Sequence, residues 1–145
     1  WRILPEFCQA HPRYERLGMR DLCEQIHGMY KANDVARLTT EMYLSDMLPS
    51  MKPSDAFAAM AHREIDRVEI DRLEGRVTSV LLTPYPPGIP LLVPGERFNQ
   101  TIVHYLQFAR EFNRTFPGFD TDIHGLVEES IAGEARYFVD CVRQN

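Results

Sequence analysis

The chain has 145 residues, the length of a single domain, and its 44% hydrophobic and 26% charged residues are typical of globular proteins. Its formal net charge of −5 argues against a nucleic-acid-binding protein, because binding phosphates requires a basic face. Unbroken aliphatic runs such as residues 80–82 are far shorter than the roughly 20 residues that a membrane-spanning helix needs.

The first half of the chain is predicted to be helical. Apolar side chains recur every three or four residues from 19 to 30, which predicts a helix with one apolar face that ends near Asn33 and Asp34. A second apolar stripe over residues 35–43 predicts another helix, which stops before Pro49. Pro53 suits the first turn of a third helix, because the N–H that proline lacks has no partner there.

The pattern then changes from helices to strands. Val68 and Ile70 alternate with charged residues, as in a half-buried strand. After a turn at Gly75, residues 77–83 are rich in β-branched and aliphatic side chains and predict a buried strand. Half of the ten prolines fall within residues 84–96, so most of that segment is predicted to be loop or sheet edge.

The last third of the chain begins with a helix signal at Asn99. This residue is a suitable N-cap for the apolar stripe over residues 102–112, and residues 116–119 end that helix. Residues 137–142 are the last strand candidate. The order of elements predicts a single α+β domain in which helices pack on a small mixed sheet.

Cysteine usage and the first residues bear on the compartment. Cys8, Cys23 and Cys141 are odd in number and widely spaced, which argues against a disulfide framework and a cysteine-rich zinc site. A reducing, cytosolic compartment is the simplest interpretation. No signal peptide is expected, and a chain that begins with Trp1 is expected to be a fragment or a processed product.

The residue types and their spacing alone do not indicate the active site of an enzyme. The sequence has no G-x-S-x-G elbow and neither of the common glycine-rich nucleotide motifs. Asp120, Asp122 and His124 alternate like metal ligands in an extended segment, but no second ligand group accompanies them. A turn with solvated or capping carboxylates is therefore favoured, and no metal is expected. His27 and His104 lie near apolar helical stripes and are expected to be packed and hydrogen-bonded.

The proline-rich segment has two interpretations. It could be a polyproline ligand for an SH3-like groove, or a stiff loop that holds Tyr85 or Glu96 in a fixed place. The apolar flanks at residues 80–82 and 91–93 would bury themselves, whereas docking motifs lie in polar surroundings, so the stiff loop is favoured. Glu96 could also simply complement the dipole of the helix that follows.

The basic residues are mostly arginine, with 14 Arg among 16 Lys and Arg. Arg13, Arg16 and Arg20 lie close together near a predicted helix start, and arginine binds phosphate or carboxylate groups well. The simpler interpretation is a solvated face on which they pair with neighbouring acidic residues. Chemistry that requires a lysine has only two candidates, Lys31 and Lys52.

Two long motifs, in this order, resemble one family. The first motif combines Leu73-Glu74-Gly75-Arg76, Pro-Tyr-Pro-Pro-Gly-Ile-Pro at residues 84–90 and Pro-Gly-Glu at residues 94–96. The second motif, residues 116–125, reads Phe-Pro-Gly-Phe-Asp-Thr-Asp-Ile-His-Gly. The chain resembles the C-terminal domain of bacterial ornithine/lysine/arginine decarboxylases, pyridoxal-phosphate-dependent enzymes of fold type I, and is most similar to inducible lysine decarboxylases. Residues 1–145 are expected to be one such domain, without the wing and cofactor-binding domains.

The resemblance implies a part of an enzyme that releases carbon dioxide from a basic amino acid, in acid stress or polyamine formation. Lysine is the favoured substrate, followed by arginine or ornithine. The domain would contact the rest of the decarboxylase chain, in homodimers that assemble into decamers, with no nucleic acid or membrane as partner. Tyr85 and Glu96 are the candidates for facing the substrate entrance. The alternative is a catalytically silent assembly or regulatory module that acts through protein contacts.

The resemblance also allows the two lysines to be checked. Pyridoxal phosphate forms a Schiff base with a lysine, which in this family lies in a Ser-x-His-Lys segment. Neither Lys31 nor Lys52 has that context. No catalytic residue is therefore assigned, the cofactor is expected only in the full-length enzyme, and this chain alone is expected to be inactive. Arg16 lies near a family position implicated in binding the alarmone ppGpp, which makes it a candidate effector-binding residue.

Overall fold

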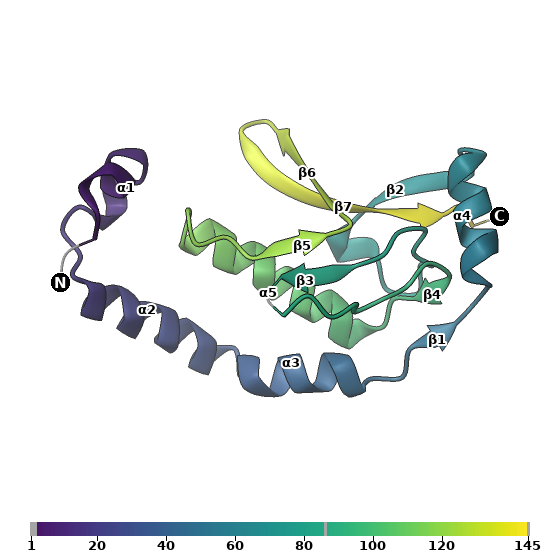
Figure 1. Cartoon of the computed structure of the whole chain (residues 1–145), viewed down its shortest axis with the longest axis horizontal. Helices are drawn as coiled ribbons and strands as arrows, with labels where there is room; N and C mark the ends of the chain where they lie inside the picture. Colours follow the sequence, from purple (N-terminus) through teal and green to yellow (C-terminus); the bar gives the residue numbers. More distant parts are fainter. Residues whose placement is uncertain (1–2, 86, 145) are drawn as a thin grey trace.

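A computed structural model describes residues 3–85 and 87–144, so Trp1 and Pro86 of the proline-rich segment lie outside the described residues. The N-terminal part is helical: α2 (Met19–Ala32) and α3 (Val35–Leu44) follow one another along one side of the molecule (Figure 1). Asp34 joins them in the left-handed conformation, with φ of 46°, which Asp adopts more readily than most residues. The short helix α1 (Pro5–Ala10) and the 3-10 turn η1 (Pro12–Tyr14) precede this pair.

The strands follow α4 (Pro53–Ala61), which begins at a proline as predicted. Antiparallel pairing places β7 (Glu134–Val142) between β2 (Ile65–Glu69) and β6 (Leu126–Ile131), and the β6–β7 hairpin projects from the body (Figure 1). Two shorter antiparallel pairs join β1 (Leu48–Pro49) to β4 (Glu96–Arg97), and β3 (Thr83–Tyr85) to β5 (Asp122–His124). The 3-10 turn η2 (Ile70–Arg72) follows β2, and α5 (Gln100–Thr115) is the long central helix.

The predicted α+β class is confirmed, but the single mixed sheet is wrong. The pairs among the described strands are all antiparallel and belong to three separate small sheets. A tight turn at Ala132 and Gly133 joins β6 to β7, and such a short connection permits only antiparallel pairing. Pro87, shortly after β3, has no N–H to donate to a ladder and so opposes the extension of that strand.

Residues 77–83 are largely buried, as predicted, but they do not form one continuous strand. Val77, Thr78 and Leu82 instead make isolated bridges to different partners. The Thr78 hydroxyl accepts a hydrogen bond from the Val80 N–H at 3.1 Å and donates to the Val80 carbonyl at 2.7 Å. This local turn competes with regular pairing and breaks the ladder.

The core is built around α5. Ile102 and Leu106 share a buried cluster with Ile70 of η2 and Val139 of β7, which we call the main cluster. Asn99 caps α5 as predicted, because its side-chain oxygen accepts a hydrogen bond from the Ile102 N–H at 2.9 Å. The cap thus fixes the start of α5, and a loop connects the C-terminal end of α5 to β5.

A second buried cluster attaches the N-terminal helices to the other end of α5. We call it the N-terminal cluster, and its fully buried members are Tyr14, Leu22, Phe112 and Phe116. The Tyr14 hydroxyl donates a hydrogen bond of 3.0 Å to the Pro117 carbonyl, which anchors η1 to the loop after α5. None of the described helices combines the length and the apolar character needed to cross a membrane.

The expectation that His27 and His104 are packed is wrong, because both side chains are exposed. His104 lies between the buried residues Val103 and Tyr105 in sequence, but each helical residue turns about 100°, which rotates His104 out of the apolar stripe. Neither histidine therefore belongs to the core.

Candidate functional site

The two motifs that sequence analysis treated separately meet in the β3–β5 pair. Tyr85 lies directly opposite Asp122, and Thr83 lies opposite His124. Alternate residues of a strand share a face, so Tyr85, Asp122 and His124 lie on one face of this small sheet. Pro84 and Ile123, at the intervening register position, are buried.

Tyr85 is an exposed aromatic residue held in a defined position. Its side chain is 60% exposed, and its ring stands edge-on to that of His124, with 6.3 Å between the ring centroids. The ring also lies against the Gly88 backbone, where an added Cβ would come within 2.8 Å of Tyr85 Cε2. The neighbouring Pro84 and Pro87 restrict the loop backbone further.

The polar groups beside Tyr85 are a carboxylate and an imidazole. The Asp122 side chain is 72% exposed, and its Oδ2 lies 3.8 Å from His124 Nε2. This contact is longer than a hydrogen bond, so the carboxylate stays accessible to solvent. A carboxylate next to an aromatic ring is a combination that attracts cations.

The Asp120–His124 segment is not arranged as a metal centre. The Asp120 carboxylate accepts a hydrogen bond of 3.3 Å from the Gly118 N–H and so serves the turn after α5. Among the described residues, no group of three or more histidine, cysteine or acidic side chains is close enough to hold a metal ion.

Glu96 lies apart from Tyr85 in the sheet arrangement. It pairs with Pro49 in the β1–β4 sheet, whereas Tyr85 belongs to the β3–β5 sheet. Its Oε2 accepts a hydrogen bond of 2.8 Å from the Val93 N–H and closes the turn between these residues. The idea that Glu96 complements a helix dipole is wrong, because the N-cap of α5 is Asn99 and Glu96 precedes its first turn.

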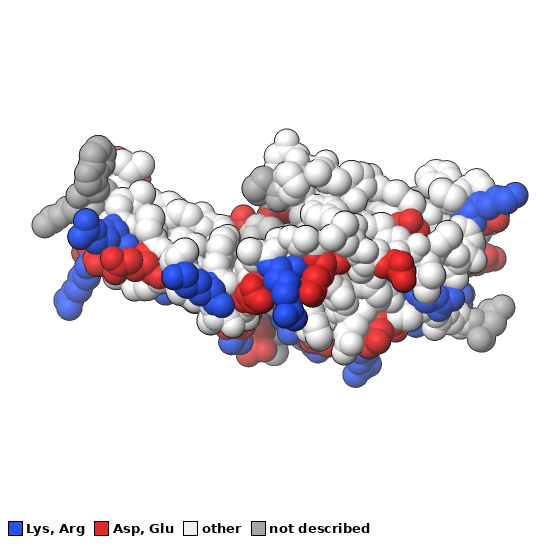
Figure 2. Space-filling model, turned by 90° about the horizontal axis from the view of Figure 1, so that it is seen from below, with Lys and Arg blue, Asp and Glu red and all other residues white. Residues whose placement is uncertain are grey.

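Arg16 is exposed in the segment between η1 and α2. The predicted pairing of the N-terminal arginines with acidic neighbours is wrong, since the ion pairs within the described residues include none of Arg13, Arg16 and Arg20. Arg13 instead stacks over the rings of Tyr14 and Phe116, at 5.2 and 5.5 Å. Figure 2 shows basic and acidic side chains interspersed along the lower face, without a field of one sign.

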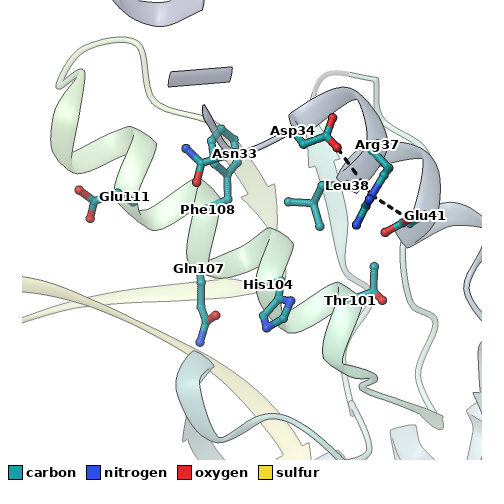
Figure 3. A pocket seen from close by; sticks show the side chains of 10 residues that line it. All are labelled: Asn33, Asp34, Arg37, Leu38, Glu41, Thr101, His104, Gln107, Phe108 and Glu111. Atoms are coloured by element: carbon teal, nitrogen blue, oxygen red, sulfur yellow. Dashed lines mark ion pairs between the residues drawn. The ribbon is translucent and has the colours of Figure 1, made fainter. Parts of the chain in front are cut away.

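Two clefts in the described part of the chain lie beside α5. A cleft of about 450 Å³ lies between α3 and α5, where Arg37 bridges Asp34 and Glu41 at 3.7 and 3.0 Å (Figure 3). A second cleft, of about 680 Å³, lies between the end of α5 and the β6–β7 hairpin, and its Arg136 is paired with Glu69 at 2.7 Å.

Neither cleft fits pyridoxal phosphate, because neither is lined by a lysine. Lys31 on α2 and Lys52 before α4 are both exposed on the surface. A Schiff-base lysine needs an enclosed position that lowers its affinity for a proton. Neither exposed lysine lies in such a position.

Residues 36–143 match the family model described as "Orn/Lys/Arg decarboxylase, C-terminal domain". The chain belongs to this family. It is 43% identical to the lysine decarboxylase LdcA of Pseudomonas aeruginosa over 98% of its own length and 19% of that protein. It is 32% identical to the biodegradative arginine decarboxylase of Escherichia coli, over 98% of this chain and 19% of that protein.

Solved structures in this family show the same fold. The structure of lysine decarboxylase A from Pseudomonas aeruginosa matches with a TM-score of 0.86 at 43% identity, over 93% of this chain and 18% of that one. The constitutive lysine decarboxylase of Escherichia coli matches with a TM-score of 0.84 at 28% identity, over 96% and 20%. The chain thus spans about a fifth of the length of these relatives.

Sequence analysis identified Tyr85 but missed Asp122 and His124 as its neighbours. The alternation of Asp122 and His124 places both on one strand face, and Gly125 follows them, but this local pattern does not specify the strand with which they pair. Gly125 has φ of 94°, and a Cβ there would collide with the Leu81 carbonyl oxygen. A glycine that permits such a close approach points to a neighbouring backbone.

Proposed function

We propose that this chain acts as the C-terminal domain of a pyridoxal-phosphate-dependent enzyme that releases carbon dioxide from a basic amino acid. The observation that carries this proposal is the family match over residues 36–143. Lysine is the favoured substrate, because the relative with 43% identity is named a lysine decarboxylase. Arginine and ornithine follow, since relatives named for these substrates are 32% identical.

In this proposal the rest of a longer polypeptide supplies the cofactor, its lysine and the catalytic groups. The domain supports the assembly of homodimers into decamers in the cytoplasm and borders the substrate entrance. The exposed side chains of Tyr85 and Ile89 in the proline-rich segment, and of Leu81 just before it, support a contact role, because exposed apolar side chains on a stiff loop favour docking. Tyr85 remains the entrance candidate, and Glu96 acts there by fixing the loop end rather than by direct contact.

The alternative is a silent assembly or regulatory module. One observation favours it: no lysine lines the cleft between α3 and α5 or the cleft below the β6–β7 hairpin. Such a module would affect the size or the regulation of an assembly, and it would not contact an active site.

The decisive experiment measures carbon dioxide release from lysine, arginine and ornithine by the full-length protein with added pyridoxal phosphate. We expect the highest kcat/KM with lysine, and no release by residues 1–145 alone. A matched full-length variant in which the cofactor lysine is replaced controls for contaminating activity. Absence of release from all three amino acids would contradict the proposed reaction and favour the silent module.

For Arg16 we propose a role in binding an anionic effector such as ppGpp. Its exposed guanidinium supports this role, since arginine binds phosphate groups in a bidentate manner. Titration of the full-length protein with ppGpp is expected to lower its activity, and Arg16→Ala is expected to weaken that effect. An activity that does not change with ppGpp would contradict the proposal.

A further inference from the structure

Tyr85, Asp122 and His124 form an exposed group that we call the β3–β5 patch. We propose that this patch binds the side-chain cation of the basic amino acid before it enters the catalytic centre. This inference rests on the proposed function, and it names the substrate group that the entrance recognises.

The chemistry of the β3–β5 patch suits an alkylammonium or guanidinium group. Asp122 offers carboxylate oxygens that accept charge-assisted hydrogen bonds, and the Tyr85 ring attracts cations. Directly opposite residues of an antiparallel pair have Cβ atoms about 4.5–5.5 Å apart. Because a cation interacts with a ring from within about 6 Å of its centroid, one ammonium group can contact Tyr85 and Asp122 together.

The patch is also held in place before any ligand arrives. Gly88 lies against the Tyr85 ring, and the His124 ring supports it edge-on at 84°. Backbone pairing in β3–β5 fixes the position of Asp122. Groups that are already ordered lose little conformational entropy when they bind, so even a small patch can contribute to affinity.

The other charged surfaces of the described chain fit a small cation less well. In the cleft between α3 and α5, Arg37 already occupies the carboxylates of Asp34 and Glu41. In the cleft below the β6–β7 hairpin, the carboxylates share the lining with Arg110, Arg114 and Arg136, which repel a cation, and Arg136 is paired with Glu69. In the β3–β5 patch, the one basic group in contact with the Asp122 carboxylate, among the residues that the structure describes, is the His124 imidazole at 3.8 Å.

The test measures steady-state decarboxylation of lysine by the full-length protein, at low and at high ionic strength. Asp122→Asn and Tyr85→Leu are each expected to raise KM about two- to five-fold at low ionic strength, with most of the effect on KM rather than kcat. Tyr85→Phe keeps the ring and is expected to raise KM less than Tyr85→Leu. The effect of Asp122→Asn should shrink at high ionic strength, because salt screens exposed charges.

Asp34→Asn is the matched control. It makes the same chemical change at a carboxylate that is 67% exposed, close to the 72% of Asp122, but on α3. An equal change of KM in Asp34→Asn and Asp122→Asn would overturn the proposal, because it would show a general effect of net charge. So would an unchanged KM in Asp122→Asn and Tyr85→Leu.

Three outcomes separate this inference from others. If Tyr85→Leu changes the size of the assembly in gel filtration and leaves KM as it was, the patch is a docking surface and the proposal is wrong. If the unmodified full-length protein releases no carbon dioxide from any basic amino acid, both the proposed function and this inference fall. If it is active and the variants behave like Asp34→Asn, only this inference falls.

Discussion

At the scale of single residues, Gly125 determines how the candidate site is assembled. Its φ of 94° lies in the region that favours glycine, and an added Cβ would meet the carbonyl oxygen of Leu81. The strand β5 can therefore run close to the chain before β3 only with glycine at this position. This close approach lies beside the Thr83–His124 end of the β3–β5 pair, whose other end holds Tyr85 opposite Asp122.

We expect Gly125→Ala to destabilise the chain by roughly 2 kcal/mol or more, because it combines backbone strain with a collision against a fixed carbonyl. The free energy of unfolding, measured by urea denaturation with circular dichroism, checks this expectation. The near-ultraviolet signal of Tyr85 and its neighbours should change in the same variant.

Two other glycines serve as controls for Gly125. Gly133 has φ of 83° but nothing within 4 Å of its added Cβ, so Gly133→Ala carries strain without collision and should cost about 1 kcal/mol. Gly28 lies within α2 with open space around it, so Gly28→Ala should stabilise by about 0.5–1 kcal/mol. Equal losses at Gly125 and Gly133 would show that the contact with Leu81 is unimportant.

At the scale of elements, local signals predicted the helices and failed for the strand pairs. Pro53 and Asn99 mark the starts of α4 and α5 through their own chemistry, so their positions could be read from the sequence. The β3–β5 pair joins segments almost forty residues apart, and no local pattern states which segments meet. The partners of Tyr85 were therefore missed, although the prolines beside it indicated a rigid loop.

Asp71 supplies polar contacts between η2 and α5, beside the buried apolar packing of Ile70. Its Oδ2 accepts a hydrogen bond of 2.6 Å from Arg110, and its Oδ1 accepts one of 2.8 Å from Gln107. The hydrogen bonds from Arg110, and then those from Gln107, hold the pKa of Asp71 below its ordinary value of 3.8, against the effect of burial. A carboxylate with a lowered pKa stabilises the fold above its ordinary pKa, and this contribution is lost as the pH falls through the lowered value.

We expect Asp71→Asn to lower the stability at pH 6 by about 1 kcal/mol or less, since the pair is partly exposed and solvent screens it. Below pH 4 the difference between the variant and the natural sequence should shrink, because protonation removes the same charge. Thermal unfolding at several pH values from 6 to 3 measures this difference. A gap in Tm that stays constant over that range would contradict the assigned role of Asp71.

At the scale of the whole molecule, α5 joins two buried clusters of different size. The main cluster contains the sheet residues and most of α5, whereas the N-terminal cluster holds α1, η1 and α2 on Phe112 and Phe116. The three cysteines report on these parts separately. Cys141 is buried in the main cluster, Cys8 packs against the N-terminal cluster, and Cys23 is exposed on α2.

Thiol labelling can therefore show whether the two clusters open together. Burial raises the pKa of the Cys141 thiol to about 12, and since the thiolate is the reactive form, we expect no labelling of native Cys141 at pH 8. Cys23 should react at once. Cys8 should become reactive at a lower urea concentration than Cys141, because the smaller cluster loses fewer buried contacts when it opens.

Variants that keep one cysteine each, with serine at the exposed position 23 and alanine at positions 8 and 141, make this measurement specific. Labelling of Cys8 and Cys141 is followed by mass spectrometry across a urea series, beside the circular dichroism of the same samples. Cys141 should follow the loss of circular dichroism, because the thiol leaves its buried position only when the main cluster unfolds. If Cys8 and Cys141 become reactive at the same urea concentration, the N-terminal cluster and the main cluster unfold as one cooperative unit. That result would contradict the prediction that the N-terminal cluster opens first.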